Sequence, residues 1–335
     1  MIADIEAAER VVRRALPQYH ADTEGELTFV KYRENWVFRI DQASGSHAVR
    51  VHRLGYRTDA ELREELDLIT WLRHADVPVP VLRRTLDAEP FCHVPDDDGD
   101  LYQVDMLAWV DGGEPLGDIG AAFTGEAVID PEMFYRLGVL MAQLHTATTS
   151  LGSTRSSLRR PWDRDGLVGE RPVWGDPLRA FADGDPDARV VARAMSTLFE
   201  QLTHYGTATH RYGPIHADFT PENVLVGGGP MTIIDFDDSG DGYYLFDLAT
   251  AAFFYLPHPN FDVVVDSLFL GYESVRPLTS DDRMMWRPLL LARGLTYLGW
   301  ATDRLGDETS DFVLESVRPV VVKLAHELAP KAAAH

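Results

Sequence analysis

The first hundred residues contain short stretches rich in aromatic and β-branched side chains, separated by turn-forming segments. Residues 27–40 and 47–52 are two such stretches, and the intervening sequence DQASGS favours a turn. This pattern predicts an antiparallel pair of strands. Residues 101–110, with the sequence LYQVDMLAWV, predict a further strand.

A helical pattern lies between these strands. Apolar side chains recur at helical spacing within residues 58–74, and Thr58 or Asp59 is a suitable N-cap. The sequence VPVP at residues 77–80 ends the helix, because the residue before a proline is disfavoured in helical geometry. The apolar positions are Leu62, Leu66, Ile69 and Leu72.

The remainder of the chain is mostly helical in pattern. Asp130 and Pro131 form an N-cap and first-turn pair before an apolar stripe over residues 133–148. Residues 150–189 differ, because they are rich in Arg, Asp, Gly and Pro, and they predict a long irregular or loosely helical insertion. Further helices are predicted over residues 190–205, 281–305 and 311–328.

Composition adds the size and charge of the protein. The chain has 335 residues, of which 45% are hydrophobic, and its 53 acidic and 31 basic side chains give a formal net charge of −22. This length exceeds the size at which one hydrophobic core usually stops growing, so we expect two subdomains. The acid excess and the lack of a long basic run argue against a nucleic-acid partner and favour cationic small molecules.

The cysteine content and the apolar runs of the chain indicate the compartment of the protein. The single cysteine, Cys92, cannot form an internal disulfide and is expected to be inert, and the first residues lack the apolar core of a signal peptide. The longest nearly apolar run, residues 245–256, is interrupted by Asp247 and is too short to span a bilayer. We therefore expect a cytoplasmic protein. The histidines have no metal-ligand spacing with the cysteine, so zinc is not supported.

Residues 215–249 hold the densest group of candidate catalytic side chains. Two β-rich stretches flank the sequence GGGP at residues 227–230 and predict a hairpin. Asp218 and Asn223 precede this hairpin, and Asp235 follows it. Because a hairpin brings its ends together, we expect these three side chains to lie close together. Oxygen ligands without His or Cys suit a hard cation such as Mg²⁺, completed by phosphate oxygens.

These motifs resemble those of the kinase-like phosphotransferase family, which includes aminoglycoside phosphotransferases, choline kinase and bacterial homoserine-kinase-like enzymes. The resemblance is carried by His216-x-Asp218-x₄-Asn223 and by the sequence IDFD at residues 234–237. It implies Mg²⁺-dependent transfer of the γ-phosphate of ATP to a hydroxyl, with GTP left open as the nucleotide. It also implies that Asp218 is the catalytic base, that Asn223 and Asp235 are metal ligands, and that His216 braces the loop.

The same resemblance implies an α+β, bilobal, protein-kinase-like fold with a small antiparallel-sheet N-lobe and a larger, mainly helical C-lobe. The nucleotide-binding lobe is expected over residues 1–105 and the hinge over residues 106–112. The catalytic and substrate-binding lobe is expected over residues 113–335, and it includes the 150–189 insertion.

In the N-terminal lobe, the resemblance implies that Arg50 is the cation for the nucleotide phosphates, where most relatives carry Lys. Its expected partner is Glu65, with Glu64 as the second choice, and a surface ion pair is the alternative interpretation. Asn35, in the segment YRENWV, is implied to form a turn near the phosphates. Main-chain groups at the hinge position are expected to meet adenine, and these belong to Leu107, Ala108 and Trp109.

The acceptor is constrained only by charge. An acidic rim formed by Asp237, Asp238 and Asp241 favours an amine-bearing alcohol, namely an aminoglycoside-like antibiotic, an amino alcohol or a homoserine-like amino acid. A solvated acidic surface is the alternative interpretation of this rim. Residues 150–189 are expected to wall the acceptor site together with residues 237–244.

Two other functions remain open at this point. One is a protein Ser/Thr kinase of the bacterial stress-response type, and the other is a catalytically degenerate nucleotide-binding scaffold, which Arg50 in place of Lys favours. Asp247, in the sequence LFDLA, is expected to be structural, either tying its helix to the catalytic loop or capping that helix. His145 is expected to be a buried, hydrogen-bonded histidine.

Overall fold

The protein divides into two compact units in the computed structural model, which describes residues 2, 4–19, 25–43, 45–151 and 157–329. The first unit comprises Met1–Glu114 and Val224–Asp237, and the second comprises Pro115–Asn223 and Asp238–His335. The segment Val224–Asp237 therefore packs with the first unit, whereas the division expected from the sequence assigns it to the C-terminal lobe.

The first unit is built on an antiparallel sheet with the strand order β1-β2-β3-β6-β4, in which β5 also pairs with β6. The predicted pairing between residues 27–40 and 47–52 is confirmed for β2 and β3, but the first stretch is not one strand. It reverses at Arg33 and Glu34, because three consecutive polar residues, 33–35, interrupt the alternation, and the two halves pair as a hairpin. The strands are β1 (Glu26–Tyr32), β2 (Asn35–Asp41), β3 (His47–His52), β4 (Leu82–Arg83), β5 (Phe91–Pro95) and β6 (Leu101–Ala108).

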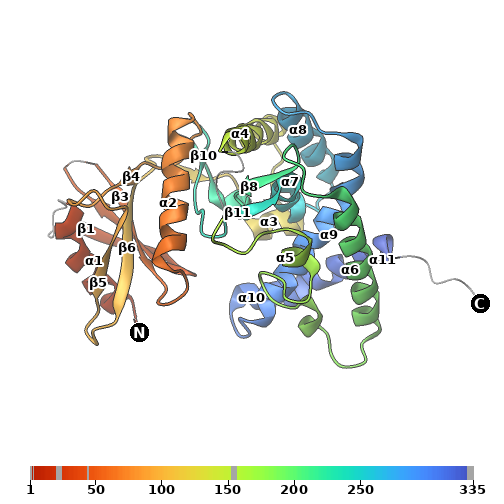
Figure 1. The fold of residues 1–335 in the computed structure, drawn as a ribbon, viewed down its shortest axis with the longest axis horizontal. Coiled ribbons are helices and arrows are strands. Elements are labelled where there is room, and N and C mark those ends of the chain that lie inside the picture. Colours follow the sequence, from red (N-terminus) through yellow and green to blue (C-terminus); the bar gives the residue numbers. More distant parts are fainter. Residues whose placement is uncertain (1, 3, 20–24, 44, 152–156, 330–335) are drawn as a thin grey trace, which may run out of the picture. The chain divides into compact units, whose positions relative to one another are not determined.

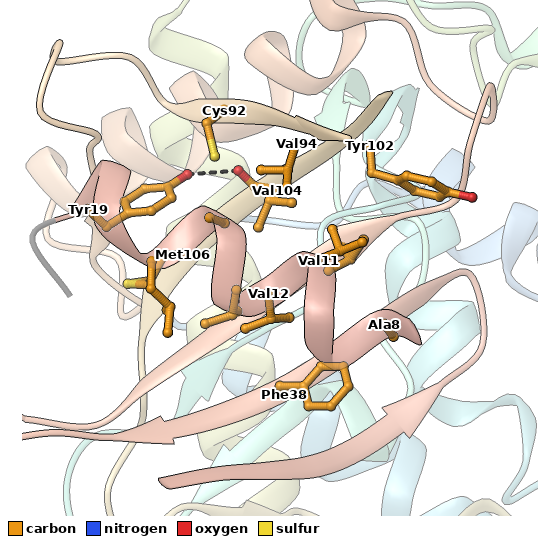
Figure 2. Packing of buried hydrophobic residues seen from close by; sticks show 14 of the residues in the cluster. Ala8, Val11, Val12, Tyr19, Phe38, Cys92, Val94, Tyr102, Val104 and Met106 are labelled. Carbon is orange, nitrogen blue, oxygen red and sulfur yellow. Dashed lines mark hydrogen bonds between the residues drawn. The ribbon is translucent and has the colours of Figure 1, made fainter. Parts of the chain in front are cut away.

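A helix that was not predicted, α1 (Ile5–Ala15), covers one face of this sheet (Figure 1). Its apolar side chains pack with those of the strands, and the hydroxyl of Tyr19 donates to the carbonyl of Val104 at 2.7 Å (Figure 2). Cys92 is buried in the same core. Burial raises the pKa of its thiol to about 11, which is consistent with the expected inert cysteine.

Two further elements of the first unit follow the sequence pattern. The predicted helix is confirmed as α2 (Asp59–His74), which begins at a capping box between Thr58 and Glu61. The predicted hairpin is confirmed as β9 (Val224–Val226) and β10 (Thr232–Ile233), which pair antiparallel.

The second unit is mainly helical. The predicted helices over residues 133–148, 190–205 and 281–305 are confirmed. The described residues between 151 and 185 contain only short helical segments, as expected, whereas residues 186–189 already belong to the helix that continues to residue 205. The apolar stretch from residue 245 is helical and buried on every side, so it has no amphipathic pattern that would predict a helix. The helices are α3 (Ile119–Thr124), α4 (Pro131–Ser150), α5 (Arg164–Val168), α6 (Pro186–Tyr205), α7 (Tyr244–Phe253), α8 (Phe261–Glu273), α9 (Ser280–Thr302), α10 (Glu308–Phe312) and α11 (Arg318–Leu328), and the strands are β8 (Tyr212–Ile215) and β11 (Gly240–Tyr243).

Helices α4 and α8 lie side by side and touch backbone to backbone (Figure 1). A Cβ atom added to Gly138 would lie 2.1 Å from the carbonyl oxygen of Leu268, and one added to Gly271 would lie 1.9 Å from that of Tyr135. The two glycines therefore allow the close approach. None of the helices in the described part of the chain combines the length and apolar character that a membrane span requires.

Candidate active site

The predicted catalytic loop begins directly after β8, with His216, Ala217 and Asp218 in sequence. The main-chain N–H groups of His216 and Ala217 donate to the carboxylate of Asp247 at 3.0 and 2.7 Å. Ala217 has a φ of +66°, a conformation that a residue with a side chain rarely adopts without support. The two hydrogen bonds to Asp247 supply this support.

Asp247 lies on α7 and is fully buried. Its carboxylate also interacts with Nε2 of His145 at 2.9 Å, and Nδ1 of His145 is 2.9 Å from the hydroxyl of Tyr272. The expected structural roles of Asp247 and His145 are therefore confirmed. The N-cap of α7 is Tyr243, so the carboxylate ties the neighbouring loop and does not cap its own helix.

Asp218 and Asn223 are in direct contact, as the sequence predicts for these two residues. Nδ2 of Asn223 donates to Oδ2 of Asp218 at 2.8 Å and to its carbonyl oxygen at 3.0 Å. Nδ1 of His216 accepts from the N–H of Asp218 at 3.2 Å, which is the bracing interaction expected of this histidine. The Asp218 side chain is 24% exposed, so its carboxylate is accessible.

Arg293 was not predicted and belongs to the same group. Its Nη2 lies 2.6 Å from Oδ1 of Asp218, and its Nη1 donates to the carbonyl oxygen of Ala217 at 3.0 Å. The Arg293 side chain is fully buried on α9. The only sequence signal for it is one arginine within the apolar run LLLARGLTYL, since an isolated charge at such a position must find a buried partner.

The described part of the 150–189 insertion contacts two residues of the predicted acidic rim. Nε1 of Trp174 donates to Oδ1 of Asp238 at 3.1 Å, and Nε1 of Trp162 donates to the carbonyl oxygen of Asp238 at 2.8 Å. The main-chain N–H of Trp162 donates to the carbonyl oxygen of Asp241 at 2.7 Å. The two indole rings pack edge to face, with centroids 5.4 Å apart.

In the first unit, Arg50 on β3 is the centre of a buried group of charges. It pairs with Glu65 on α2 at 2.9 Å, which confirms the predicted partner and places the pair in the interior rather than on the surface. It also pairs with Asp105 on β6 at 2.8 Å, and Asp105 contacts His52 at 2.6 Å. Asp105 was not predicted, although the strand register brings it opposite Arg50.

Asp237 joins this group in the first unit, whereas Asp238 and Asp241 belong to the second unit. Nδ2 of Asn35 donates to the Asp237 carboxylate, and Nη1 of Arg50 lies 3.6 Å from it. Burial and the negative charges of neighbouring carboxylates raise the pKa of Asp237 to about 7. The three residues of the predicted acidic rim are therefore divided between the two units.

Asp235 has an unexpected cationic neighbour. Nζ of Lys31, on β1, lies 3.1 Å from Oδ2 of Asp235. Burial alone would raise the pKa of Asp235, but the charges of Lys31 and Arg50 outweigh burial and lower it. Asp235 also has a φ of +67°, so this predicted site residue shares the strained left-handed conformation of Ala217.

The predicted hinge residues lie at the end of β6. The main-chain N–H of Ala108 donates to the carbonyl oxygen of Val81 at 2.8 Å, and that of Trp109 donates to Ser46 at 2.9 Å. Leu107 is buried within the sheet. These two N–H groups are therefore engaged by the protein itself.

Solved structures with the same architecture confirm the expected α+β, kinase-like fold. A microcompartment-associated aminopropanol kinase superposes with a TM-score of 0.81, and it is 28% identical over 97% of each chain. An amicoumacin kinase solved with AMP-PNP and Ca²⁺ superposes with a TM-score of 0.73 at 16% identity, over 96% of this chain and 94% of that one.

Sequence comparisons point to the same group of enzymes. The chain is 28% identical over 305 residues to a homoserine kinase of Burkholderia lata, a match that covers 85% of this chain and 81% of the relative. It is 22% identical over 260 residues to an amicoumacin kinase of Bacillus subtilis, covering 75% and 69%. A sequence model of the phosphotransferase enzyme family matches residues 29–284. The family resemblance in the motifs is thus confirmed, and the chain belongs to the phosphotransferase enzyme family.

Proposed function

We propose that this phosphotransferase transfers the γ-phosphate of ATP to the hydroxyl of a small, amine-bearing molecule and uses Mg²⁺. The observation that carries the proposal is the contact between Asp218 and Asn223 on a loop anchored by Asp247. This arrangement gives one accessible carboxylate a fixed position, which is the main requirement for a base in phosphoryl transfer.

Asp218 is the proposed catalytic base. Its Oδ1 is held by Arg293 and its Oδ2 by Asn223, so the plane of the carboxylate is set before an acceptor binds. The exposed edge of the carboxylate would accept the hydrogen bond of the acceptor hydroxyl and then its proton. His216 contributes by fixing the main chain at Asp218.

Asn223 and Asp235 are the proposed Mg²⁺ ligands, and their donor atoms fit this metal. Because Nδ2 of Asn223 donates to Asp218, the amide oxygen is the atom that can face a cation. The ammonium group beside Asp235 supports the view that this carboxylate attracts positive charge. Carboxylate and amide oxygens are ligands that Mg²⁺ accepts. When bound, the metal would neutralise negative charge on the nucleotide phosphates.

On the nucleotide side, we propose that Arg50 anchors the buried group of charges, since two carboxylates already hold it. Lys31, which is 43% exposed, is the more mobile cation for the phosphates. Asn35 and Asp237 support the turn between β1 and β2. The base of the nucleotide, ATP or GTP, would meet main-chain carbonyl groups of residues 106–112.

The proposed acceptor is an amino alcohol or a hydroxy amino acid, with an aminoglycoside-like antibiotic as a larger alternative. The similarity to an aminopropanol kinase and to homoserine kinases supports this class, because both names describe small hydroxyl compounds with an amine. Asp238 and Asp241 remain candidates for contacting the amine. We further propose that the enzyme acts in the cytoplasm, without a nucleic-acid partner, in keeping with its net charge of −22.

A direct assay tests this function. The purified protein is incubated with Mg²⁺ and ATP and with separate amino alcohols, homoserine, an aminoglycoside or a generic protein substrate, and mass spectrometry detects added phosphate. We expect a phosphorylated amino alcohol or hydroxy amino acid, and no product when EDTA is present. Phosphate on the protein substrate alone would identify a protein kinase instead. Nucleotide binding without any transfer would support the scaffold alternative.

A further inference from the structure

The ion pair between Arg293 and Asp218 joins a fully buried cation to an accessible carboxylate. The two groups are 2.6 Å apart, the Arg293 side chain is 0% exposed, and the Asp218 side chain is 24% exposed. The guanidinium thus contacts the inner oxygen of the proposed base and leaves its outer edge accessible.

Aromatic rings hold the guanidinium in one orientation. The Arg293 guanidinium lies 4.1 Å from the ring centroid of Tyr297 and 4.6 Å from that of Trp174. Its Nη2 also donates to the hydroxyl of Tyr297 at 2.8 Å. Contacts with ring faces are favourable for a planar cation. A planar guanidinium also loses little conformational entropy for each hydrogen bond that it forms.

Stability alone does not account for an arginine at this position. Burying an ion pair costs desolvation on both sides, and well-packed apolar residues often stabilise a fold equally well. Arg293 instead donates to two acceptors of the loop that carries the proposed base, namely the carboxylate of Asp218 and the carbonyl oxygen of Ala217. Asp247 accepts hydrogen bonds from the main-chain N–H groups of His216 and Ala217 in the same loop. The loop is therefore clamped through both its donors and its acceptors.

We propose that Arg293 is the positioning residue for the catalytic base, an inference that rests on the proposed function. In the reaction, the acceptor oxygen forms a bond to the γ-phosphorus, the bond from that phosphorus to the leaving ADP oxygen breaks, and the hydroxyl proton passes to Asp218. Arg293 stays protonated throughout. It holds Oδ1 of Asp218 so that the outer edge of the carboxylate faces the acceptor hydroxyl.

The test compares Arg293→Gln and Arg293→Lys with a matched control, Arg211→Gln. Arg211 also lies over a tyrosine ring, at 4.3 Å from Tyr205, and also donates to a main-chain carbonyl, but its carboxylate partner is Asp281. In Arg293→Gln we expect kcat to fall about 100-fold, as for a misplaced catalytic group. The KM for nucleotide should stay within about twofold, because a positioning role affects the chemical step and not nucleotide binding.

Arg293→Lys keeps the positive charge but loses the planar guanidinium that donates to two acceptors at once, so its kcat should lie between those of the wild type and Arg293→Gln. Arg211→Gln should keep the wild-type kcat and nucleotide KM. If Arg293→Gln does not fold, Tyr297→Phe removes one support of the guanidinium without removing charge, and its kcat should fall several-fold with the nucleotide KM unchanged.

Several results would overturn the inference. A folded Arg293→Gln with the wild-type kcat excludes a positioning role, and so does a loss of kcat that Arg211→Gln shows to the same extent. If Arg293→Gln cannot be obtained, an unchanged kcat in Tyr297→Phe also excludes a positioning role for Arg293. These outcomes leave the proposed function intact, because the wild type still transfers phosphate. A wild type that phosphorylates no acceptor overturns the proposed function and this inference together.

Discussion

Lys31 and Asp235 form an ion pair in the first unit, with Nζ of the lysine 3.1 Å from Oδ2 of the carboxylate. The lysine lies near the end of β1, just before the turn at Arg33 and Glu34, and its side chain is 43% exposed. Its ammonium group occupies a position next to the proposed metal ligand. Lysine and a divalent cation would therefore compete for the same carboxylate.

This competition predicts that Lys31→Met raises the affinity of the nucleotide-free protein for a divalent cation. Because exposed ion pairs contribute about 0–1 kcal/mol, we expect a gain of about two- to fivefold. Binding of Mn²⁺ followed by electron paramagnetic resonance measures it, and high salt should reduce the difference. Lys323→Met, an exposed lysine on α11, is the control. A lower Mn²⁺ affinity in Lys31→Met would contradict the competition.

Asp218→Asn should abolish phosphate transfer and preserve nucleotide binding. The amide keeps the size of the side chain but is no longer a base, so we expect kcat to fall by at least about 10²-fold, the scale of general-base catalysis. Nucleotide affinity, measured by calorimetry with Mg²⁺ and ATP, should change little. Transfer at more than about a tenth of the wild-type rate would exclude Asp218 as the base.

Asp247→Ala should destabilise the second unit, because it leaves the N–H groups of His216 and Ala217 buried without their acceptor. We expect the free energy of unfolding to fall by about 3 kcal/mol, as for other broken buried charge networks. Urea denaturation measures the change. Asp118→Ala is the control, since Asp118 accepts one N–H at the exposed N-terminus of α3, and its loss should cost about 1 kcal/mol. Equal losses in the two variants would contradict the anchoring role.

Gly138→Ala should separate α4 from α8. The added Cβ would lie 2.1 Å from the carbonyl oxygen of Leu268, which is main chain and cannot move aside alone. We expect a loss of about 2–3 kcal/mol in the free energy of unfolding, as for other overpacked contacts. Gly229→Ala, where no heavy atom lies within 4 Å of the added Cβ, should be nearly neutral in the same urea experiment. A neutral Gly138→Ala would show that the helices can move apart at little cost.

Local patterns were sufficient wherever a short segment determines its own structure. The capping box at Thr58, the hairpin that follows Asn223, and the contact of Asn223 with Asp218 all arise within a few residues. The resemblance of the catalytic motif added the roles of residues within one short loop. These features are accessible from sequence because few alternative geometries exist for such segments.

Ion pairs between residues far apart in the chain could not be predicted from local sequence patterns. Arg293 and Asp218 are 75 residues apart, and Lys31 and Asp235 are 204 residues apart. Nothing in the local sequence of either residue specifies its partner, although a charge within an apolar run indicates that a buried partner exists. The boundary between the two units was equally inaccessible, because it falls between the consecutive residues 237 and 238 of the expected acidic rim.

The last prediction concerns Asp237 and pH. Its pKa is raised to about 7 in the folded protein, against 3.8 as the ordinary value, so the folded state binds a proton more tightly than the unfolded state. Stability therefore falls as pH rises between about 4 and 7 from this group alone. Asp237→Asn removes the titration and keeps an oxygen that can accept from Asn35.

We accordingly compare the free energy of unfolding of Asp237→Asn with that of the wild type at pH 5 and at pH 8. The difference, variant minus wild type, should be about 2 kcal/mol larger at pH 8 than at pH 5. The reason is that at pH 8 the wild type must bury an ionised carboxylate near Asp235 and Glu65, whereas at pH 5 that carboxylate is protonated. Urea denaturation of the metal-free protein at both pH values measures the difference. Asp262→Asn, exposed on α8, corrects for the general effect of removing one negative charge from an acidic protein. If the two variants show the same pH dependence, Asp237 is ionised throughout this range and the surrounding cations, Arg50 above all, outweigh its burial.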